Sequence, residues 1–190
     1  MMCTPRARVP SSDEGMPSRG SLRAVCDREL PRLATAVHNG SMSYEKTYVM
    51  LKPGVLQRRL VGEIIARVEA KSLKLIGLKL IHISRDLAET HYGEHKGKPF
   101  YDGLITYITS GPVVAMVVAG ETAIGHVRTL AGATKVEEAL PGTIRGDFAA
   151  VTSKNIIHAS DSPESAEREI GLFFKDEEII DYEDGNAEWF

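Results

Sequence analysis

The pattern of hydrophobic and polar positions changes abruptly near residue 42. Residues 1–41 are rich in proline, arginine and serine and show no apolar periodicity beyond one helical turn, which is typical of disordered segments. We therefore expect a disordered N-terminal extension over residues 1–41 and a single domain over residues 42–190. The alternative is that Met42 is the true start, because the ordered pattern begins directly after it.

The first half of the domain alternates between strand and helix patterns. Residues 47–51 are β-branched and aromatic enough to predict a strand that ends at a Lys-Pro-Gly turn. Over residues 60–68 the apolar side chains recur on one face with helical spacing, which predicts an amphipathic helix. Residues 75–83 predict a second strand, and residues 85–110 predict short helices. The residues expected to break these helices are Gly93, Gly97, Pro99 and Gly103.

The second half predicts two more strands and two more helices. Residues 113–119 form an apolar run of strand length, which indicates burial on both faces. Residues 122–131 predict a helix, and residues 132–145 predict a long loop of the kind that often carries function. Residues 155–159 predict a short strand, and residues 162–174 predict a helix capped by serine with proline at its first position. This order of elements predicts an α+β sandwich in which helices cover one sheet.

Composition narrows the class of protein. The chain has 190 residues, of which 43% are hydrophobic, enough to build the core of one domain. Its 23 Lys and Arg against 26 Asp and Glu give a net charge of −3, which argues against nonspecific binding to nucleic acid or anionic membranes. The longest apolar run, Val113–Ala119, is far shorter than the roughly 20 residues of a membrane span.

The cysteines and the N-terminal residues bear on the compartment. Only Cys3 and Cys26 occur, so no disulfide framework holds the domain together. Residues 1–41 lack the apolar core of a secretory signal. We therefore expect a protein of a reducing compartment, the cytoplasm.

Two motifs fail on inspection. Residues 120–125 have the glycine spacing of a P-loop, but His126 and Val127 stand where the P-loop requires lysine and then serine or threonine. His91 and His95 have the spacing of a zinc-binding pair on a helix, but a glycine separates them and no glutamate is placed as in a metalloprotease. We therefore expect these two histidines to be exposed to solvent and expect no dedicated metal site.

Residues 155–162, Asn-Ile-Ile-His-Ala-Ser-Asp-Ser, carry the most suggestive chemistry. His158 lies at the end of a predicted strand, just before the N-terminus of a capped helix. Free backbone amides and the helix dipole favour an anion at this position. An imidazole there can bind phosphate or attack phosphorus as a nucleophile. Taken alone, this setting favours a structural histidine whose two ring nitrogens are both hydrogen-bonded.

Taken with residues 141–148, Pro-Gly-Thr-Ile-Arg-Gly-Asp-Phe, this segment closely resembles the nucleoside diphosphate kinase family. The resemblance continues in family order and spacing from about Tyr44 to Phe190. The other matching segments are residues 60–64, 91–92, 98–100, 110–116 and 165–169. The resemblance implies an enzyme that moves the γ-phosphate of a nucleoside triphosphate, mainly ATP, to a nucleoside diphosphate. It also implies that the reaction follows a ping-pong mechanism through phosphohistidine, and that the enzyme maintains the NTP and dNTP pools.

The resemblance also implies a role for each matching residue. His158 would be the nucleophile, attacking through its pros nitrogen Nδ1, with Ser160 and Glu169 supporting the imidazole. Phe100 would stack on the base, which explains tolerance of any common nucleotide. Mg²⁺ would arrive on the substrate's phosphates, since the sequence has no carboxylate cluster to hold it. The matching contacts to phosphate and ribose are Lys52, Tyr92, Arg128, Thr134, Arg145 and Asn155.

In architecture, the resemblance implies a ferredoxin-like sandwich with a four-stranded antiparallel sheet, assembled into hexamers or tetramers. The chain departs from the family at Gly54-Val55, where Asp-Gly is usual after Lys-Pro, and at Lys135-Val136, where Asn-Pro is usual. The alternative is a noncatalytic ferredoxin-like module or scaffold. An RNA-binding version would display aromatic side chains on its strands, but the strands here are aliphatic, so no specific nucleic-acid partner is expected.

Overall fold

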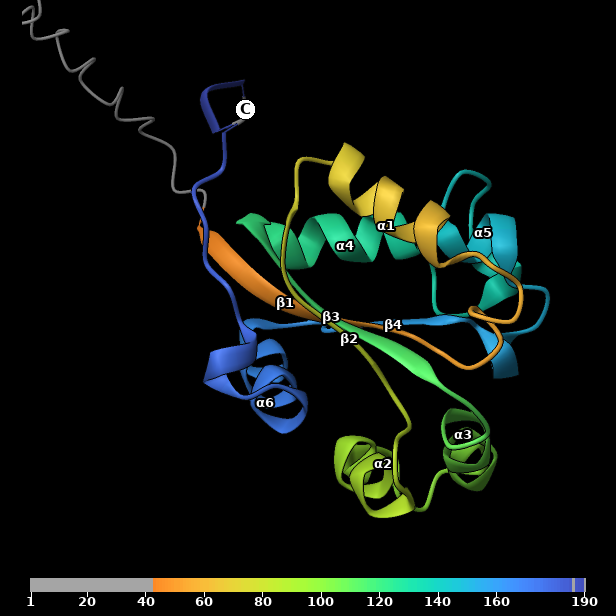
Figure 1. Ribbon diagram of the computed structural model, residues 1–190. Coiled ribbons are helices and arrows are strands. Elements are labelled where there is room, and N and C mark those ends of the chain that lie inside the picture. The colour runs from red at the N-terminus through yellow and green to blue at the C-terminus, as the bar shows by residue number, and fades with distance from the viewer. Residues whose placement is uncertain (1–42, 186, 190) are drawn as a thin grey trace, which may run out of the picture. The chain divides into compact units, whose positions relative to one another are not determined.

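A computed structural model describes residues 43–185 and 187–189 of the chain. Four strands form one antiparallel sheet in the order β2-β3-β1-β4, with helices on both faces (Figure 1). The predicted α+β sandwich with a four-stranded antiparallel sheet is therefore confirmed. The strands are β1 (Tyr44–Leu51), β2 (Lys74–Ile81), β3 (Val113–Glu121) and β4 (Ile157–Ala159).

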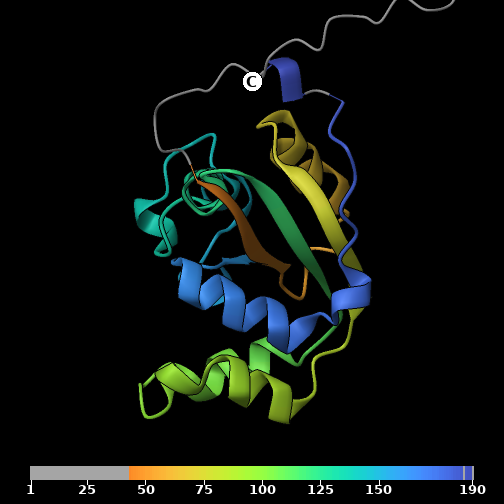
Figure 2. The same cartoon turned by 90° about the vertical axis from the view of Figure 1, so that its left-hand side faces the viewer.

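The helices form two layers. In Figures 1 and 2, α1, α4 and α5 cover one face of the sheet, and α2, α3 and α6 cover the other. The helices are α1 (Val61–Ala70), α2 (Arg85–His91), α3 (Tyr101–Ile108), α4 (Ala123–Ala131), α5 (Ile144–Phe148) and α6 (Pro163–Phe173). Short 3₁₀ turns span Gly93–His95, Val136–Glu138, Thr152–Lys154, Asp176–Glu178 and Ala187–Trp189.

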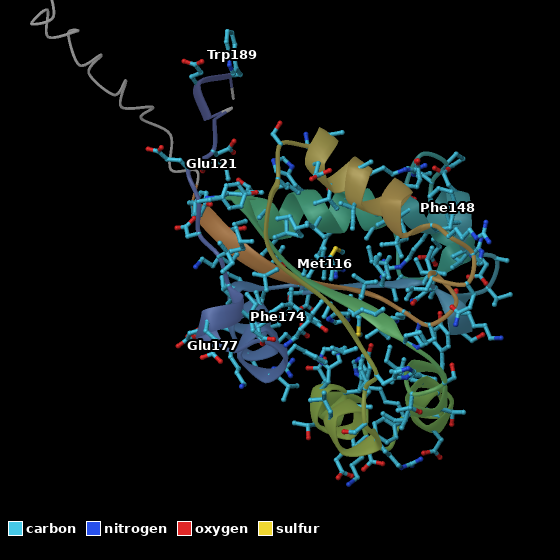
Figure 3. All side chains as sticks on the ribbon, in the orientation of Figure 1. Met116, Glu121, Phe148, Phe174, Glu177 and Trp189 are labelled. Atoms are coloured by element: carbon cyan, nitrogen blue, oxygen red, sulfur yellow. The ribbon has the colours of Figure 1, made fainter. Side chains whose placement is uncertain are left out.

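The central strand β3 explains why the sheet needs both layers. All of its residues except Glu121 are buried, as the unbroken apolar run predicts. Successive side chains point to opposite faces, so Met116 packs with the layer of α1 and α4, whereas Val117 packs with the layer of α2, α3 and α6. Figure 3 shows Met116 and Phe174 on opposite sides of the sheet.

The start of α6 follows directly from its sequence. Ser162 accepts a hydrogen bond from the Ser165 amide, and the Ser165 hydroxyl accepts one from the Ser162 amide, so the two residues form a capping box. Pro163 occupies the first helical position, where its missing N–H costs nothing. This cap fixes the helix that carries Glu169 next to the end of β4.

One predicted helix break is wrong. Gly103 lies inside α3 and does not end it. A glycine costs roughly 1 kcal/mol relative to alanine within a helix, but α3 buries Tyr101, Ile105 and Ile108 against the core, which offsets that cost. The predicted long loop over residues 132–145 contains a 3₁₀ turn and the first two residues of α5.

The predictions for residues 1–41 lie outside the described residues and stay predictions. Within the part of the chain that the structure describes, no helix is long and apolar enough to cross a membrane.

Candidate active site

A cavity of about 1110 Å³ opens where β4, α3, α6 and the residues between α4 and β4 meet. Nine of the ten residues implicated by the sequence line it, and Ser160 lies just behind, buried against Glu169. The volume is ample for a nucleotide, since typical ligand pockets measure about 300–1,000 Å³. The nine are Lys52, Tyr92, Phe100, Arg128, Thr134, Arg145, Asn155, His158 and Glu169.

His158 is held by hydrogen bonds from two elements. It lies on edge strand β4, where its backbone pairs with Met50 of β1. Its Nε2 lies 2.9 Å from Oε2 of Glu169 on α6. The Ser160 hydroxyl donates to the same carboxylate oxygen at 2.6 Å. The ring orientation is therefore set by Glu169, which is itself held by Ser160.

The protonation states of this pair follow from burial and pairing. Burial lowers the pKa of His158, although the Glu169 carboxylate opposes this shift. Burial by itself would raise the pKa of Glu169, but its contacts with His158 and Ser160 lower that pKa overall. At neutral pH the carboxylate is therefore ionised and the imidazole neutral, with its one proton on Nε2, which donates to Glu169.

That tautomer leaves Nδ1 of His158 with its lone pair free. No hydrogen bond links Nδ1 to any of the described residues. The His158 side chain keeps 20% of its surface exposed at the cavity. A neutral, oriented and accessible imidazole nitrogen is a nucleophile that needs no general base to activate it.

A strained turn brings Asn155 beside Lys52. Ile156 adopts φ +58°, a conformation that a β-branched residue rarely takes and that costs roughly 1–3 kcal/mol. Around it the Ile157 amide donates to the Asn155 carbonyl at 2.7 Å, and the Lys52 amide donates to the Ile156 carbonyl at 2.8 Å. The turn thus joins the end of β1 to the start of β4 at the cavity wall.

Lys52 is a buried cation without a carboxylate partner. It is 5% exposed, and its ammonium donates to Oδ1 of Asn155 at 2.8 Å. Asn155 in turn donates to the Thr134 carbonyl at 3.3 Å. Burial, with a smaller contribution from Arg145, lowers the pKa of Lys52 to about 7. A bound anion would restore the ordinary, higher pKa, so the site favours negative charge.

Gly54 shapes the turn that follows Lys52. Gly54 adopts φ +97°, which suits glycine far better than any other residue. Its amide donates to the side chain of Gln57 at 2.9 Å. Lys52 still lines the cavity despite the departure from the family at Gly54-Val55.

Two arginines complete the cationic wall. Arg145 donates to the carbonyls of Gly132 at 2.6 Å and Ile157 at 2.8 Å, which fixes its guanidinium. Burial and the nearby Arg128 lower its pKa to about 10, so it stays charged at neutral pH. No carboxylate of the described residues forms an ion pair with Lys52, Arg128 or Arg145. Three cations at one wall form a site for a polyanion such as a phosphate chain.

Phe100 gives the mouth of the cavity an aromatic surface. It is 54% exposed although it is a large apolar side chain. His95 lies edge-on to it, with the ring centroids 5.6 Å apart. An exposed aromatic ring beside an anion site is suited to stacking on a planar heterocycle.

Sequence reasoning missed Leu104, Tyr107 and Thr152, which also line the cavity. For Leu104 and Tyr107, the one signal in the sequence is their place on the helix after Phe100.

The prediction for His91 is wrong. His91 is 2% exposed, because it is the last residue of α2 and shares with Ala88 the face that packs on the sheet. Its ring lies 4.3 Å from that of Tyr92 and 5.1 Å from that of Phe173, between centroids. His95, beyond the break at Gly93, is turned toward the cavity and partly exposed.

The fold and the site define a class, an α+β phosphotransfer enzyme with a histidine facing a polyanion site. A family model described as nucleoside diphosphate kinase matches residues 45–179. A nucleoside diphosphate kinase of Archaeoglobus fulgidus is 58% identical over 145 residues, 76% of this chain and 96% of that protein. One from Treponema pallidum is 58% identical over 149 residues, 78% of this chain and all of that protein.

A solved structure shows the same fold. The nucleoside diphosphate kinase of Halobacterium salinarum, determined in complex with CDP, superposes with a TM-score of 0.75 at 48% identity, covering 77% of this chain and 98% of that one. This chain belongs to the nucleoside diphosphate kinase family. The ferredoxin-like fold and the transfer of phosphate between nucleotides, both predicted from the resemblance, are confirmed, and no observation favours the noncatalytic alternative.

Proposed function

We propose that Nδ1 of His158 takes the γ-phosphate of a nucleoside triphosphate and passes it to a nucleoside diphosphate in a second half-reaction. The observation that carries this proposal is the 2.9 Å contact between Nε2 and Glu169, because it assigns the proton to Nε2 and the lone pair to Nδ1. Steady-state rates measured against both substrates should give the parallel double-reciprocal lines of a ping-pong reaction. Intersecting lines would contradict it.

The chemistry balances on the residues present. The Nδ1 lone pair forms a bond to phosphorus, and the bond to the β,γ-bridging oxygen breaks, so the diphosphate leaves with that electron pair. The phosphorylated ring gains positive charge, which the Glu169 carboxylate opposes through Nε2–H. In the second half-reaction a β-phosphate oxygen of the acceptor forms the new bond, and the electron pair returns to Nδ1.

Positioning and charge supply most of the catalysis in phosphoryl transfer. Lys52, Arg128 and Arg145 line the cavity, and in this proposal they bind the phosphate chain and balance the charge that builds up as the bridging bond breaks. Tyr92, Thr134 and Asn155 line the same cavity and suit contacts with phosphate and ribose. Among the described residues, no cluster of carboxylates near these cations offers the oxygen ligands Mg²⁺ prefers, so Mg²⁺ enters as part of the substrate, bound to its phosphates.

Replacing Phe100 with alanine should raise KM about tenfold for purine and pyrimidine nucleotides alike, with a smaller change in kcat. Stacking on an aromatic ring contributes roughly 1–3 kcal/mol per base and does not depend on base identity. KM values for ADP, GDP, CDP and UDP test this, with Phe100→Tyr as the matched control that keeps the ring. A loss confined to one base would contradict stacking as the role of Phe100.

Glu169 is a positioning residue, and Glu169→Gln tests that role. The amide oxygen still accepts the Nε2 proton but carries no charge, so kcat should fall about 10- to 100-fold while KM changes little. The pH at which the kcat of wild type falls on the acid side should also drop in the variant, because His158 loses the carboxylate that favours its protonated form. An unchanged pH profile with a raised KM would show a merely structural role.

We infer a homo-oligomer, a hexamer or tetramer, that works in the cytoplasm. Edge strand β2 exposes Leu78 and Leu80, at 52% and 60%, and such an exposed apolar edge favours pairing with another chain. Sedimentation equilibrium should give the mass of four or six chains for wild type and a smaller mass for Leu80→Glu. A monomeric wild type would contradict the inference.

A further inference from the structure

His91 lies buried behind the nucleophile with neither ring nitrogen satisfied. It is 2% exposed, and no described residue provides a hydrogen-bond partner for its Nδ1 or Nε2. Burying an unpaired imidazole costs free energy that folding must recover elsewhere. Its ring lies 4.7 Å from that of His158, between centroids, and its Nδ1 lies 3.9 Å from Oε1 of Glu169.

The three side chains form a potential ligand set for a metal. One nitrogen each from His91 and His158 and one oxygen of Glu169 all lie within 4.8 Å of one another. Ligand atoms around a tetrahedral zinc ion are about 3.3 Å apart, given bonds of 2.0–2.2 Å. Side-chain shifts of about 1 Å would therefore bring the three atoms to the spacing of a zinc site. Two imidazoles and one carboxylate suit Zn²⁺, whereas Mg²⁺ prefers oxygen ligands.

Protons do not compete for these ligand atoms at neutral pH. Burial and the neighbouring His158 lower the pKa of His91 to about 3, His158 is neutral, and Glu169 is ionised. Metal binding requires these deprotonated forms. Three cations oppose the ion. Nη2 of Arg168 lies 3.5 Å from Oε1 of Glu169 and must move aside, and Lys52 and Arg145 add repulsion at His158.

We propose that His91, His158 and Glu169 bind a zinc-class divalent ion, and that the bound ion switches off phosphorylation of His158. The ion takes Nε2 of His158, the atom that now donates to Glu169. A neutral imidazole carries one proton, so metal on Nε2 moves that proton to Nδ1. Nδ1 then has no lone pair for phosphorus. The inhibitory effect rests on the proposed function of His158, whereas the binding does not.

Zinc binding is measured first, without reference to activity. The full chain, with Cys3→Ser and Cys26→Ser to remove its two thiols, competes against a chromophoric zinc chelator in excess Mg²⁺. We expect one zinc ion per chain with a Kd of about 1 µM or tighter. His91→Phe keeps the ring shape and should weaken binding at least about tenfold, and His91→Gln serves if the phenyl variant does not fold. His95→Ala, a histidine of the same cavity, should bind zinc as wild type does.

Inhibition is measured on the same proteins. Protein loaded with zinc and freed of excess metal is mixed rapidly with ATP and Mg²⁺, and the phosphoenzyme formed in the first turnover is quantified. Loading should slow phosphorylation of wild type and His95→Ala at least about tenfold, and a zinc-selective chelator should restore it. His91→Phe should be unaffected relative to its own zinc-free rate.

Three results would overturn the proposal: wild type without a tight zinc ion, His91→Phe that binds zinc as tightly as wild type, or zinc-loaded wild type that phosphorylates at the metal-free rate. Failure of the proposed function is recognised separately, because metal-free wild type would then form no phosphoenzyme at all.

Discussion

Replacing His158 with alanine should lower kcat for phosphate transfer by at least about 10⁴-fold and abolish the phosphoenzyme. The alanine leaves no atom to accept the phosphoryl group, and direct transfer would require both nucleotides in one cavity at the same time. Losses of this size are usual when a covalent nucleophile is removed. Radiolabelled ATP with Mg²⁺ measures the phosphoenzyme, and a coupled assay measures turnover.

His95→Ala provides the matched control for this variant. His95 lines the same cavity and is partly exposed, but its Nδ1 accepts a hydrogen bond from the Lys98 ammonium at 3.1 Å, so that lone pair is not free. It should keep the phosphoenzyme and most of the activity. If His158→Ala retained phosphoenzyme while His95→Ala lost it, the nucleophile would be His95.

Replacing Lys52 with methionine should have opposite effects on activity and stability. The ammonium is placed to bind phosphates, so its loss should reduce kcat/KM about 10²- to 10³-fold, the usual effect of removing one charge-stabilising donor. The same ammonium is buried without a carboxylate, so the variant should be more stable at pH 7, by an amount on the order of 2 kcal/mol.

The pH dependence of stability gives a sharper test of the same group. The pKa of Lys52 is about 7 in the folded protein and ordinarily 10.5. Between these two pH values the unfolded chain binds more protons than the folded chain, so the contribution of Lys52 makes wild type more stable as pH rises from about 7 to 10.5. Below pH 7 the folded protein bears the full free-energy cost of burying the charged lysine. Urea unfolding across this range should show that rise in wild type and a flatter profile in Lys52→Met. Parallel profiles would contradict the lowered pKa.

Nucleotide binding should raise the lowered pKa of Lys52 again. In the nucleotide-free protein at pH 8 the side-chain amine of Lys52 is largely deprotonated. A bound triphosphate raises the pKa of this amine, so wild type should take up close to one proton per nucleotide. Calorimetry in buffers of different ionisation enthalpy measures this uptake. Lys52→Met should show none, and equal uptake in both proteins would assign the proton to another group.

Much of the fold could be predicted because local signals agreed with the tertiary structure. The unbroken apolar run of β3 and the Ser-Pro start of α6 each specify their element without help from distant residues. The candidate site could be predicted only through the family resemblance. Lys52, Arg145 and His158 are 106 positions apart from first to last, and no local pattern indicates that they meet.

What sequence reasoning missed depends on tertiary packing. Whether Gly103 breaks a helix depends on how much apolar surface the rest of α3 buries, which only the packed core determines. His91 was expected to face solvent because the zinc-binding pattern that it shares with His95 fails. Its burial follows from the orientation of α2 on the sheet, and that orientation also brings it to the back of His158.

The central claim is that phosphate passes through Nδ1 of His158. The most direct measurement is ³¹P NMR of the protein after reaction with ATP and Mg²⁺ and removal of nucleotide, followed by addition of GDP. The account predicts one resonance of an Nδ1-phosphohistidine, stable in alkali and labile in acid, which disappears as GTP forms. A resonance from Nε2-phosphohistidine, a phosphate on another residue, or a phosphoenzyme that GDP does not discharge would contradict it.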